Sequence, residues 1–339
     1  MKKIIVLFLL ITCSAYSRFI PWKSPKIKVP GHFPYVKDVY AWLNSVKRQY
    51  SKFVDIESYG YSYRGKNRGV KNLKAIIIRD KRFKQKRVAF FNGGIHAREF
   101  MSVLVPILWV NETLYKIKNG HAFWSEYIKR VKLVVIPLIN PDGYAMARSG
   151  WNWRKNARPV KYRSPMKCPN SYGVDLNRNF DAFFYPVKFS WHYTWGGAKP
   201  FSEPETRYLR DYLINKNIRV SLSLHSYGRY LAFPWWGRKR RRIRHYRLHR
   251  RIAKRAVRYM RGYIFRQGCP YAVRGNYGDW IYKIHKCITY TIEIGDKFNP
   301  DYKTSIKWYN EIRRGIDVIL SYGTKSRSLR KKLFAPVAE

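Results

Sequence analysis

The chain has 339 residues, 46% of them hydrophobic and 17% aromatic, which permits a sizeable buried core and excludes an intrinsically disordered protein. Its 69 Lys and Arg against 20 Asp and Glu give a net charge of +49. Such an excess favours contact with polyanions or an acidic matrix, although a solubilising surface bias explains it equally well. Because carboxylates are scarce, each Asp or Glu inside a motif carries more weight than usual.

The N-terminus has the pattern of a secretory signal peptide. Met1-Lys2-Lys3 precedes an apolar run from Ile4 to Thr12, and small residues follow at Ala15 and Ser17. The run is too short to span a bilayer, since a membrane helix needs ~20 apolar residues. We therefore expect residues 1–17 to be a signal peptide and the mature chain to be secreted, extracellular and without a membrane span.

Three cysteines remain after removal of the signal, and they are Cys168, Cys269 and Cys287. In a secreted chain this number predicts one disulfide and one free thiol, and the sequence does not show which two residues pair. No C-x-x-C motif occurs, which argues against a zinc site built from cysteines.

Beyond the signal, residues 18–34 are rich in Pro and Lys and predict an extended lead-in. Apolar residues at helical spacing predict an amphipathic helix over residues 40–50. Short apolar runs with β-branched residues then alternate with helix-like stretches. The predicted strands are 75–78, 88–91, 133–137, 220–224 and 288–294, and the further predicted helices are 101–118, 203–215, 244–261 and 304–320.

Strands that are apolar nearly throughout, alternating with helices, indicate an α/β fold. We expect one globular domain over residues 35–323, with a mixed, mostly buried β-sheet flanked by helices, and a polar tail over residues 324–339. The densest basic segment, Arg238 to Arg258, predicts a helix with a charged exposed face, with polyanion binding as the alternative.

One short motif carries the chemistry. His96 and Glu99 form a His-x-x-Glu directly after the predicted strand 88–91, and His225 follows the predicted strand 220–224. Imidazole and carboxylate ligands suit zinc, and three protein ligands with one open position are typical of a catalytic site. We therefore predict one Zn²⁺ per chain, held by His96, Glu99 and His225.

The sequence resembles the zinc metallocarboxypeptidase family of the carboxypeptidase A/B type, from about Tyr35 to about Ile319. The resemblance rests on several motifs in the family's order. They are residues 140–144 (Asn-Pro-Asp-Gly-Tyr), 153–156 (Trp-Arg-Lys-Asn), 173–180 (Gly-Val-Asp-Leu-Asn-Arg-Asn-Phe), 201–206 (Phe-Ser-Glu-Pro-Glu-Thr), 225–227 (His-Ser-Tyr) and 290–293 (Tyr-Thr-Ile-Glu). It implies an enzyme that hydrolyses the C-terminal peptide bond of peptides or proteins. A monomer is the default expectation.

The resemblance also implies roles for single residues. Glu293 matches the general base, and a carboxylate in an apolar strand has a raised pKa that suits it to take a proton from water. Asp175 and Asp142 are expected to orient the ligand histidines, although a turn function for Asp142 in Pro-Asp-Gly is equally natural. The implied substrate-binding residues are Asn177 and Arg178, which grip the terminal carboxylate, Tyr271, which caps the substrate, and Arg98 and Tyr227.

One family feature is displaced in this chain. The arginine that stabilises the oxyanion of the tetrahedral intermediate belongs three residues after Arg154, where this chain has Ala157. The next residue is Arg158, and we expect it to serve instead. If it does not, the enzyme is slow, because loss of one oxyanion donor typically costs ~10²–10³ in kcat.

The resemblance implies that the pocket for the terminal side chain has no carboxylate. Gly278 stands where family members that prefer terminal Lys or Arg have an acidic residue, and its expected neighbours are Ala232, Val273, Asn276 and Thr291. We therefore expect apolar or aromatic terminal residues to be preferred. Arg266 would instead select acidic residues, and the small pocket residues leave room for an unusual substrate. The alternative function is a weakly active or inactive scaffold that binds polyanions.

Overall fold

The structure is a computed structural model that describes residues 30–70, 72–159, 173–187, 189–238, 243–269 and 271–335. The predicted signal peptide, most of the lead-in and Cys168 lie outside these residues. The elements are α2 (Val36–Gln49), β1 (Val54–Gly60), α3 (Tyr63–Asn67), β2 (Leu73–Ile78), β3 (Arg87–Asn92), α4 (Met101–Lys118), α5 (Trp124–Arg130), β4 (Val131–Ile136), α6 (Pro141–Arg148), η1 (Leu176–Arg178), α7 (Pro204–Leu213), β5 (Ile218–His225), β6 (Tyr230–Phe233), α8 (Tyr246–Val257), β7 (Ile264–Gln267), α9 (Tyr277–His285), β8 (Ile288–Glu293), α10 (Tyr302–Ser321) and α11 (Arg327–Lys331).

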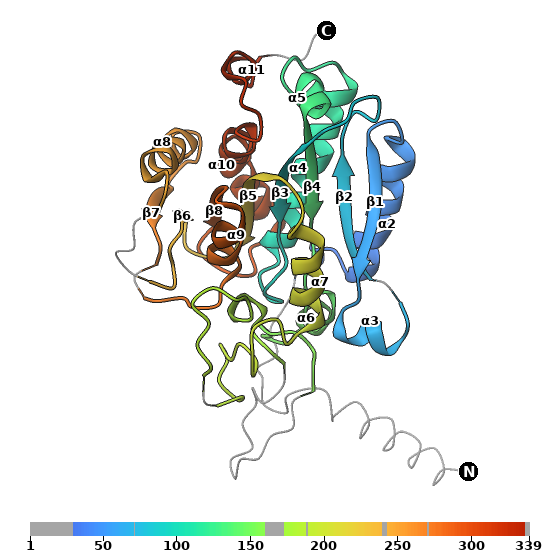
Figure 1. The fold of residues 1–339 in the computed structure, drawn as a ribbon. Helices are drawn as coiled ribbons and strands as arrows, with labels where there is room; N and C mark the ends of the chain where they lie inside the picture. Colours follow the sequence, from blue (N-terminus) through green and yellow to red (C-terminus); the bar gives the residue numbers. More distant parts are fainter. Residues whose placement is uncertain are drawn as a thin grey trace, which may run out of the picture.

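The strands form one 8-stranded mixed sheet in the order β1-β2-β4-β3-β5-β8-β6-β7 (Figure 1). Its centre is parallel, because β4, β3, β5 and β8 all run the same way. Towards one edge β2 and β1 pair antiparallel, and towards the other β6 is antiparallel to β8 and parallel to β7. The predicted α/β fold with a mixed sheet is therefore confirmed.

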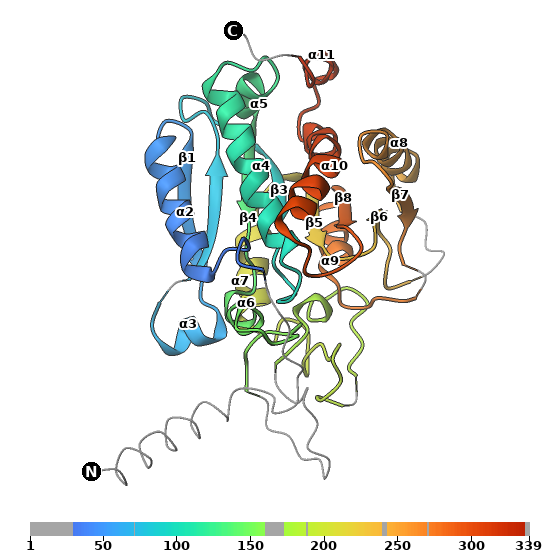
Figure 2. The same cartoon turned by 180° about the vertical axis from the view of Figure 1, so that it is seen from behind.

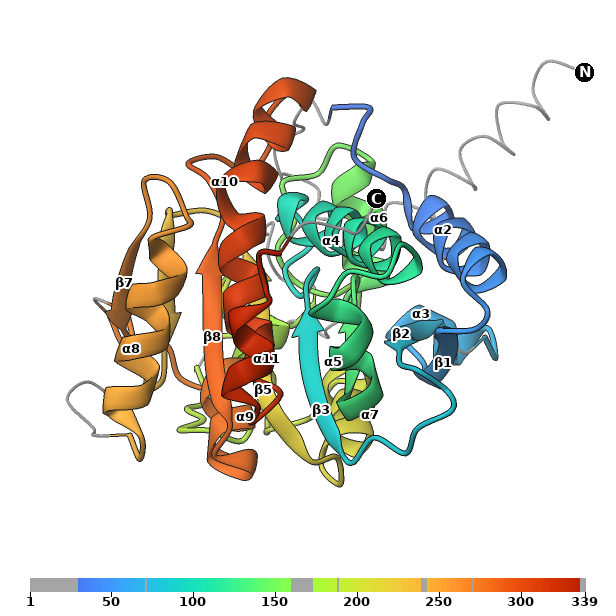
Figure 3. The same ribbon diagram turned by 90° about the horizontal axis from the view of Figure 1, so that it is seen from above.

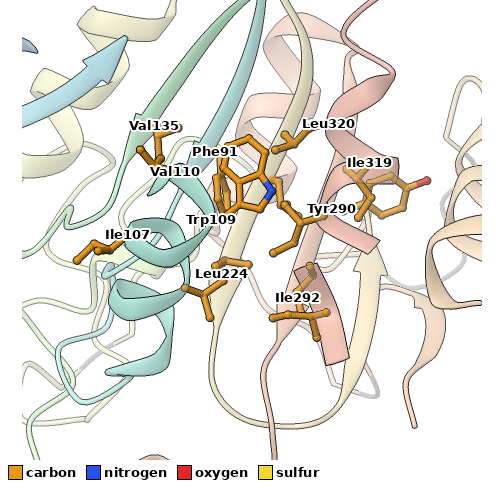
Figure 4. Close-up of a cluster of buried hydrophobic side chains, with 14 of the residues drawn as sticks. Phe91, Ile107, Trp109, Val110, Val135, Leu224, Tyr290, Ile292, Ile319 and Leu320 are labelled. Carbon is orange, nitrogen blue, oxygen red and sulfur yellow. The ribbon is translucent and has the colours of Figure 1, made fainter. Parts of the chain in front are cut away.

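Helices cover both faces of the sheet, as Figures 2 and 3 show from two further directions. The alternation of side chains along β3 explains why both faces are apolar: Ala89 and Phe91 enter one core, whereas Val88 and Phe90 enter the other. The larger core lies under α4 and α10 and is drawn in Figure 4. The smaller core lies under α7 and α9. A sheet buried on both faces produces the nearly continuous apolar runs of the sequence.

The predicted strands correspond to β2, β3, β4, β5 and β8, and the predicted helices to α2, α4, α7, α8 and α10. The sequence did not reveal the edge strands β1 and β7, nor β6, which lies between β8 and β7. Strand β7 is the least visible of the three in the sequence. It carries no buried residue, so it lacks the apolar run that marks a strand. Helix α6 was also missed, because its Pro-Asp-Gly start resembles a turn. In fact Pro141 lies in the first turn, and the Asn140 side chain accepts from Gly143 N at 3.0 Å as the N-cap.

The predicted polar tail is wrong over its described part. Residues 327–331 form α11, and Leu329 and Leu333, four residues apart, are buried. Both leucines, one in α11 and the other in the turn after it, belong to the larger hydrophobic core, so this segment packs against the domain. At the other end of the chain Phe33 is buried and the His32 Nε2 atom lies 2.8 Å from Ser305 Oγ, so the end of the lead-in also packs on the domain.

Among the described residues no helix is both long enough and apolar enough to cross a membrane. Cys269 and Cys287 are free thiols in the structure, and the second is buried beside Thr289. The predicted disulfide is therefore not formed between Cys269 and Cys287 in this structure, and Cys168 lies outside the described residues.

The larger core supplies the first testable prediction. Trp109 of α4 packs edge-on against Phe91, as Figure 4 shows, and against Trp124. Its Nε1 donates to Asp317 Oδ1 at 2.8 Å. Trp109→Ala should lower the free energy of unfolding by about 3–5 kcal/mol, since it opens a cavity and removes the donor to a buried carboxyl. Tyr115→Ala, at a position 60% exposed on the same helix, is the control and should change it by less than about 0.5 kcal/mol. Urea unfolding followed by circular dichroism measures both, and equal losses would contradict this account of the core.

Candidate active site

Three strand ends and one tight turn assemble the site. Strands β3, β5 and β8 are parallel neighbours, so their carboxyl ends meet at one edge of the sheet. His225 and Glu293 are register partners there, as the last residues of β5 and β8. The turn after β3 needs two glycines: a Cβ on Gly93 would collide with the Ser102 carbonyl, and Gly94 has φ +64.

That turn returns the chain so that the His-x-x-Glu motif faces His225. The Glu99 side chain joins the two imidazoles: His96 Nδ1 lies 2.7 Å from Oε1, and His225 Nδ1 lies 3.0 Å from Oε2. The two Nδ1 atoms are 3.1 Å apart, and all three side chains are buried. One ligand atom from each residue lies within 4.8 Å of the others.

These residues fit zinc. Two imidazole nitrogens face each other and a carboxylate inside a buried site. Their lone pairs point toward one place, where a metal cation can bind. His96 is also fixed from behind, because its Nε2 lies 3.2 Å from Asp175 Oδ1. A proton on Nε2 shared with this carboxylate leaves Nδ1 free as a ligand. The structure thus brings together the three predicted ligands.

Asp175 has a central position behind the metal ligands. It is completely buried, and besides His96 it accepts from Arg154 Nε at 2.9 Å, while Arg178 Nη1 lies 4.0 Å away. Burial alone would raise the pKa of Asp175, but the two guanidinium groups and His96 lower it well below its usual range. The expectation for Asp142 is wrong: its Oδ2 accepts from Arg64 N at 2.7 Å, away from the histidines.

A cavity of about 290 Å³ opens over the predicted metal site. Every substrate-binding residue expected from the sequence lines it, and these are Arg98, Asn177, Arg178, Tyr227 and Tyr271. Arg178 is held in place by a bond from its Nη1 to the Asn177 carbonyl at 2.9 Å, and Asn177 Oδ1 accepts from Tyr277 N at 2.8 Å. Tyr271 is 65% exposed at the surface of the cavity.

Glu293 lines the same cavity. Burial raises the pKa of its carboxyl to about 7, although His225 opposes the rise. A carboxyl with a pKa near neutrality exchanges protons readily at physiological pH. The geometry therefore agrees with the predicted role, which stays a prediction until activity is measured.

The structure does not bring Arg158 to this cavity. Its Nη1 bonds Glu203 Oε1 at 2.6 Å, and Glu203 is completely buried. A buried carboxylate needs a cationic partner, which explains why Arg158 turns away from the site. Arg154 lines the cavity in its place, with Nη1 3.6 Å from Glu99 Oε1. Arg154 belongs to the Trp-Arg-Lys-Asn motif, so the sequence did point to this segment. Only the direction of the side chain shows that Arg154, and not Arg158, faces the cavity.

The inner part of the cavity contains residues that the sequence did not identify. Gly278 lies there as expected, and a Cβ on it would be 3.3 Å from Asn276 Oδ1, 3.6 Å from Thr291 Oγ1 and 4.0 Å from Trp236 Nε1. Trp236 was missed because its position, between β6 and α8, belongs to none of the motifs. Val273 also lines the cavity, whereas Ala232 and Arg266 do not. The Arg266 guanidinium lies 4.8 Å from the ring of Tyr230.

Comparison with known proteins agrees with this geometry. A model of the zinc carboxypeptidase family matches residues 39–312. The chain is 27% identical over 287 residues to carboxypeptidase O from Bos taurus, covering 81% of this chain and 74% of that protein. It is 33% identical over 204 residues to carboxypeptidase B from Astacus astacus, covering 58% of this chain and 62% of that protein. The crystal structure of carboxypeptidase A from Helicoverpa armigera aligns with a TM-score of 0.75 at 23% identity, covering 87% of this chain and 75% of that one.

The fold and the ligand set define a metal-dependent hydrolase with its site at the carboxyl end of a mixed sheet. Since the family model spans most of the chain, this protein belongs to the zinc carboxypeptidase family. It is a zinc metallocarboxypeptidase, a class of peptide hydrolase that acts on peptide C-termini, and its cofactor is one zinc ion. The structural match at 23% identity supports the fold alone.

The ligand geometry predicts one zinc ion per chain, lost when a ligand is removed. His225→Gln should reduce bound zinc to near zero, because a ligand atom that faces Glu99 and His96 is displaced. His245→Gln, at an exposed position just before α8, should keep one equivalent. Elemental analysis after dialysis measures both. Zinc retained at one equivalent by His225→Gln would contradict the assignment.

Substitution of Arg158 should affect stability, whereas substitution of Arg154 should affect catalysis. Arg158→Ala should lower the free energy of unfolding by about 1–3 kcal/mol, because Glu203 loses a cationic partner, and it should leave kcat nearly unchanged. Arg154→Ala should lower kcat by about 10²–10³-fold. Zinc content of both variants must be determined alongside, since Arg154 also contacts Asp175 and Glu99. A large kcat loss in Arg158→Ala with intact stability would restore the original expectation.

Proposed function

We propose that this enzyme removes single residues from the C-termini of peptides or proteins, with Glu293 as the general base. The observation that carries the proposal is the convergence of the zinc ligand set, Glu293 and Arg178 on one cavity. A fixed guanidinium near the metal site restricts cleavage to chain ends, because only a terminal residue offers a carboxylate for it to bind.

Substrate binding begins with the terminal carboxylate. Arg178 and Asn177 are held by backbone and side-chain bonds before any substrate arrives, so little orientation entropy is lost on binding. Tyr271, exposed beside them, is free to cover the bound residue. Arg98 and Tyr227 line the cavity on the side of Phe298, and the Arg98 guanidinium lies 4.5 Å from the Phe298 ring centroid.

Proton transfer is the task of Glu293. The carboxylate takes a proton from the attacking water, whose oxygen bonds the scissile carbonyl carbon. It then gives that proton to the amide nitrogen as the C–N bond breaks, which releases the terminal residue. Zinc, when bound by its three ligands, supplies Lewis acidity that acidifies water and polarises a carbonyl. Arg154 faces this region, and we assign to its guanidinium the stabilisation of the negative charge on the carbonyl oxygen.

The terminal side chain is proposed to be uncharged. No carboxylate other than Glu99 and Glu293 lies among the cavity-lining residues, so a terminal Lys or Arg would lose hydration without a counter-charge. Arg266, the cation that would select an acidic side chain, is not among the described residues that line the cavity. Aromatic and apolar residues remain as predicted. A terminal tyrosine would gain in addition, because the Trp236 Nε1 and Thr291 hydroxyl near Gly278 offer partners to its hydroxyl group.

Secretion as a monomer and contact with polyanions complete the proposal. The first part rests on the signal-like N-terminus, outside the described residues. The alternative of an inactive polyanion-binding scaffold has one observation in its favour, the charge of +49. Such a scaffold would not need an intact zinc ligand set with Glu293 beside it. We therefore propose that polyanion binding accompanies catalysis and does not replace it.

Blocked dipeptides that differ only in the terminal residue test the proposed function. The purified protein should release uncharged terminal residues, with kcat/KM for Tyr, Phe and Leu at least about tenfold above that for Lys or Glu. A chelator should abolish release and added zinc should restore it. Glu293→Gln should lower kcat by about 10²–10⁴-fold while zinc stays bound. Absence of chelator-sensitive release from every dipeptide would refute the enzymatic proposal.

A further inference from the structure

The charge excess that catalysis does not use is concentrated around α8. Between Asp211 and Asp279 the sequence contains no Asp or Glu. One face of α8 packs into the core through His249, Ile252 and residues around them, and the opposite face is cationic. At ~1.5 Å per residue this helix is about 18 Å long, so its Lys and Arg form a short, straight row of positive charge.

A second helix extends this row. Six basic residues on the two helices, exposed or half-buried, are together called the α8–α11 ridge. They are Arg250, Arg251, Lys254, Arg255, Arg327 and Arg330. The two helices lie close together, because Tyr259 just after α8 packs on Phe334 just after α11 with ring centroids 4.6 Å apart. In agreement with this geometry, burial and the charges of Arg255, Arg251 and Arg327 lower the pKa of Arg330, against an opposing effect of Tyr322. None of the six forms an ion pair with a carboxylate of the residues that the structure describes.

Unpaired like charges on neighbouring helices repel one another and destabilise the folded chain. The core provides no reason for this arrangement, because the buried face of α8 would pack equally well with neutral residues on its exposed face. A bound polyanion removes the repulsion and gains from release of its counterions. The ridge therefore has the properties of a binding surface.

The ridge lies at the end of the domain opposite the active site. Gly323, just before α11, approaches Val131 at the start of β4, and His249 of α8 accepts from Thr289 N at 3.2 Å at the start of β8. The metal ligand His225 and the base Glu293 are at the other ends of β5 and β8. Figure 1 shows α8 and α11 in the upper part of the molecule and the yellow-green loops that precede α7 at the bottom. A ligand on the ridge leaves the cavity open.

The chemistry of the ridge favours one class of polyanion. Single-stranded nucleic acid is held by aromatic side chains that stack on bases, but the aromatic group near the ridge, Tyr259, is already packed on Phe334 with ring centroids 4.6 Å apart. A membrane-surface helix needs a free apolar face, and that of α8 is buried in the core. Rows of guanidinium groups without either feature suit a chain that presents only anionic groups at regular spacing.

We propose that the α8–α11 ridge binds a linear sulfated polysaccharide and anchors the enzyme to it with the active site open. The test uses immobilised heparin as the probe and the full-length zinc enzyme. The ridge variant carries Arg250→Gln, Arg251→Gln, Lys254→Gln and Arg327→Gln, all at exposed positions. Its matched control carries Lys37→Gln, Lys47→Gln, Arg48→Gln and Lys52→Gln, exposed on or next to α2, and so has the same net charge.

The wild-type enzyme should bind heparin with a steep salt dependence and hydrolyse blocked dipeptides while bound. The ridge variant should bind about tenfold or more weakly at about 0.15 M NaCl, with a shallower dependence on salt, and the control should bind like wild type. Both variants should keep wild-type kcat/KM, which separates this test from that of the proposed function. Equal losses in the two variants, or no binding by wild type, would overturn the proposal. So would ridge-dependent binding of single-stranded DNA or anionic vesicles that equals or exceeds binding of heparin.

Discussion

The register between β5 and β8 is the constraint on which the active site depends. It sets His225 and Glu293 side by side at the carboxyl ends of two parallel strands, one as a metal ligand and the other as the proposed base. Since side chains alternate along a strand, a shift of one residue would turn one of them to the opposite face of the sheet. The register is fixed by burial on both faces, where apolar side chains such as Leu222 and Ile292 have no alternative position.

Behind this pair the site is held by charge. Asp175 is a completely buried carboxylate that contacts both the ligand His96 and the guanidinium of Arg154, and it lies near Arg178. A buried carboxylate of this kind requires compensation, and its partners are the groups proposed to act on the substrate. Glu203 has the same requirement and meets it with Arg158, which leaves Arg154 to the cavity. The competition of two buried acids for two arginines thus determines which arginine faces the substrate.

The cations of the cavity and those of the α8–α11 ridge lie at opposite ends of the domain. Within the cavity, cations are few, fixed and directed at a carboxylate or a developing negative charge. On the α8–α11 ridge they are exposed or half-buried and without carboxylate partners among the described residues. The separation of these two groups by the length of the sheet means that the polysaccharide proposed for the ridge would leave the active site open.

The sequence by itself determined the α/β class, the central strands and the three metal ligands. Buried parallel strands require continuous apolar runs, which are visible in the sequence. A His-x-x-Glu directly after such a run is equally visible, because its residues are close together in the chain. Strands β6 and β7 escaped detection because each has only four residues, and β7 in addition has no buried residue and therefore no apolar run. The choice of Arg154 over Arg158, the role of Trp236 and the packing of α11 were decided only by tertiary structure. Each depends on where a side chain finds its partner across the fold, as Arg158 does with Glu203, and no local pattern encodes that direction.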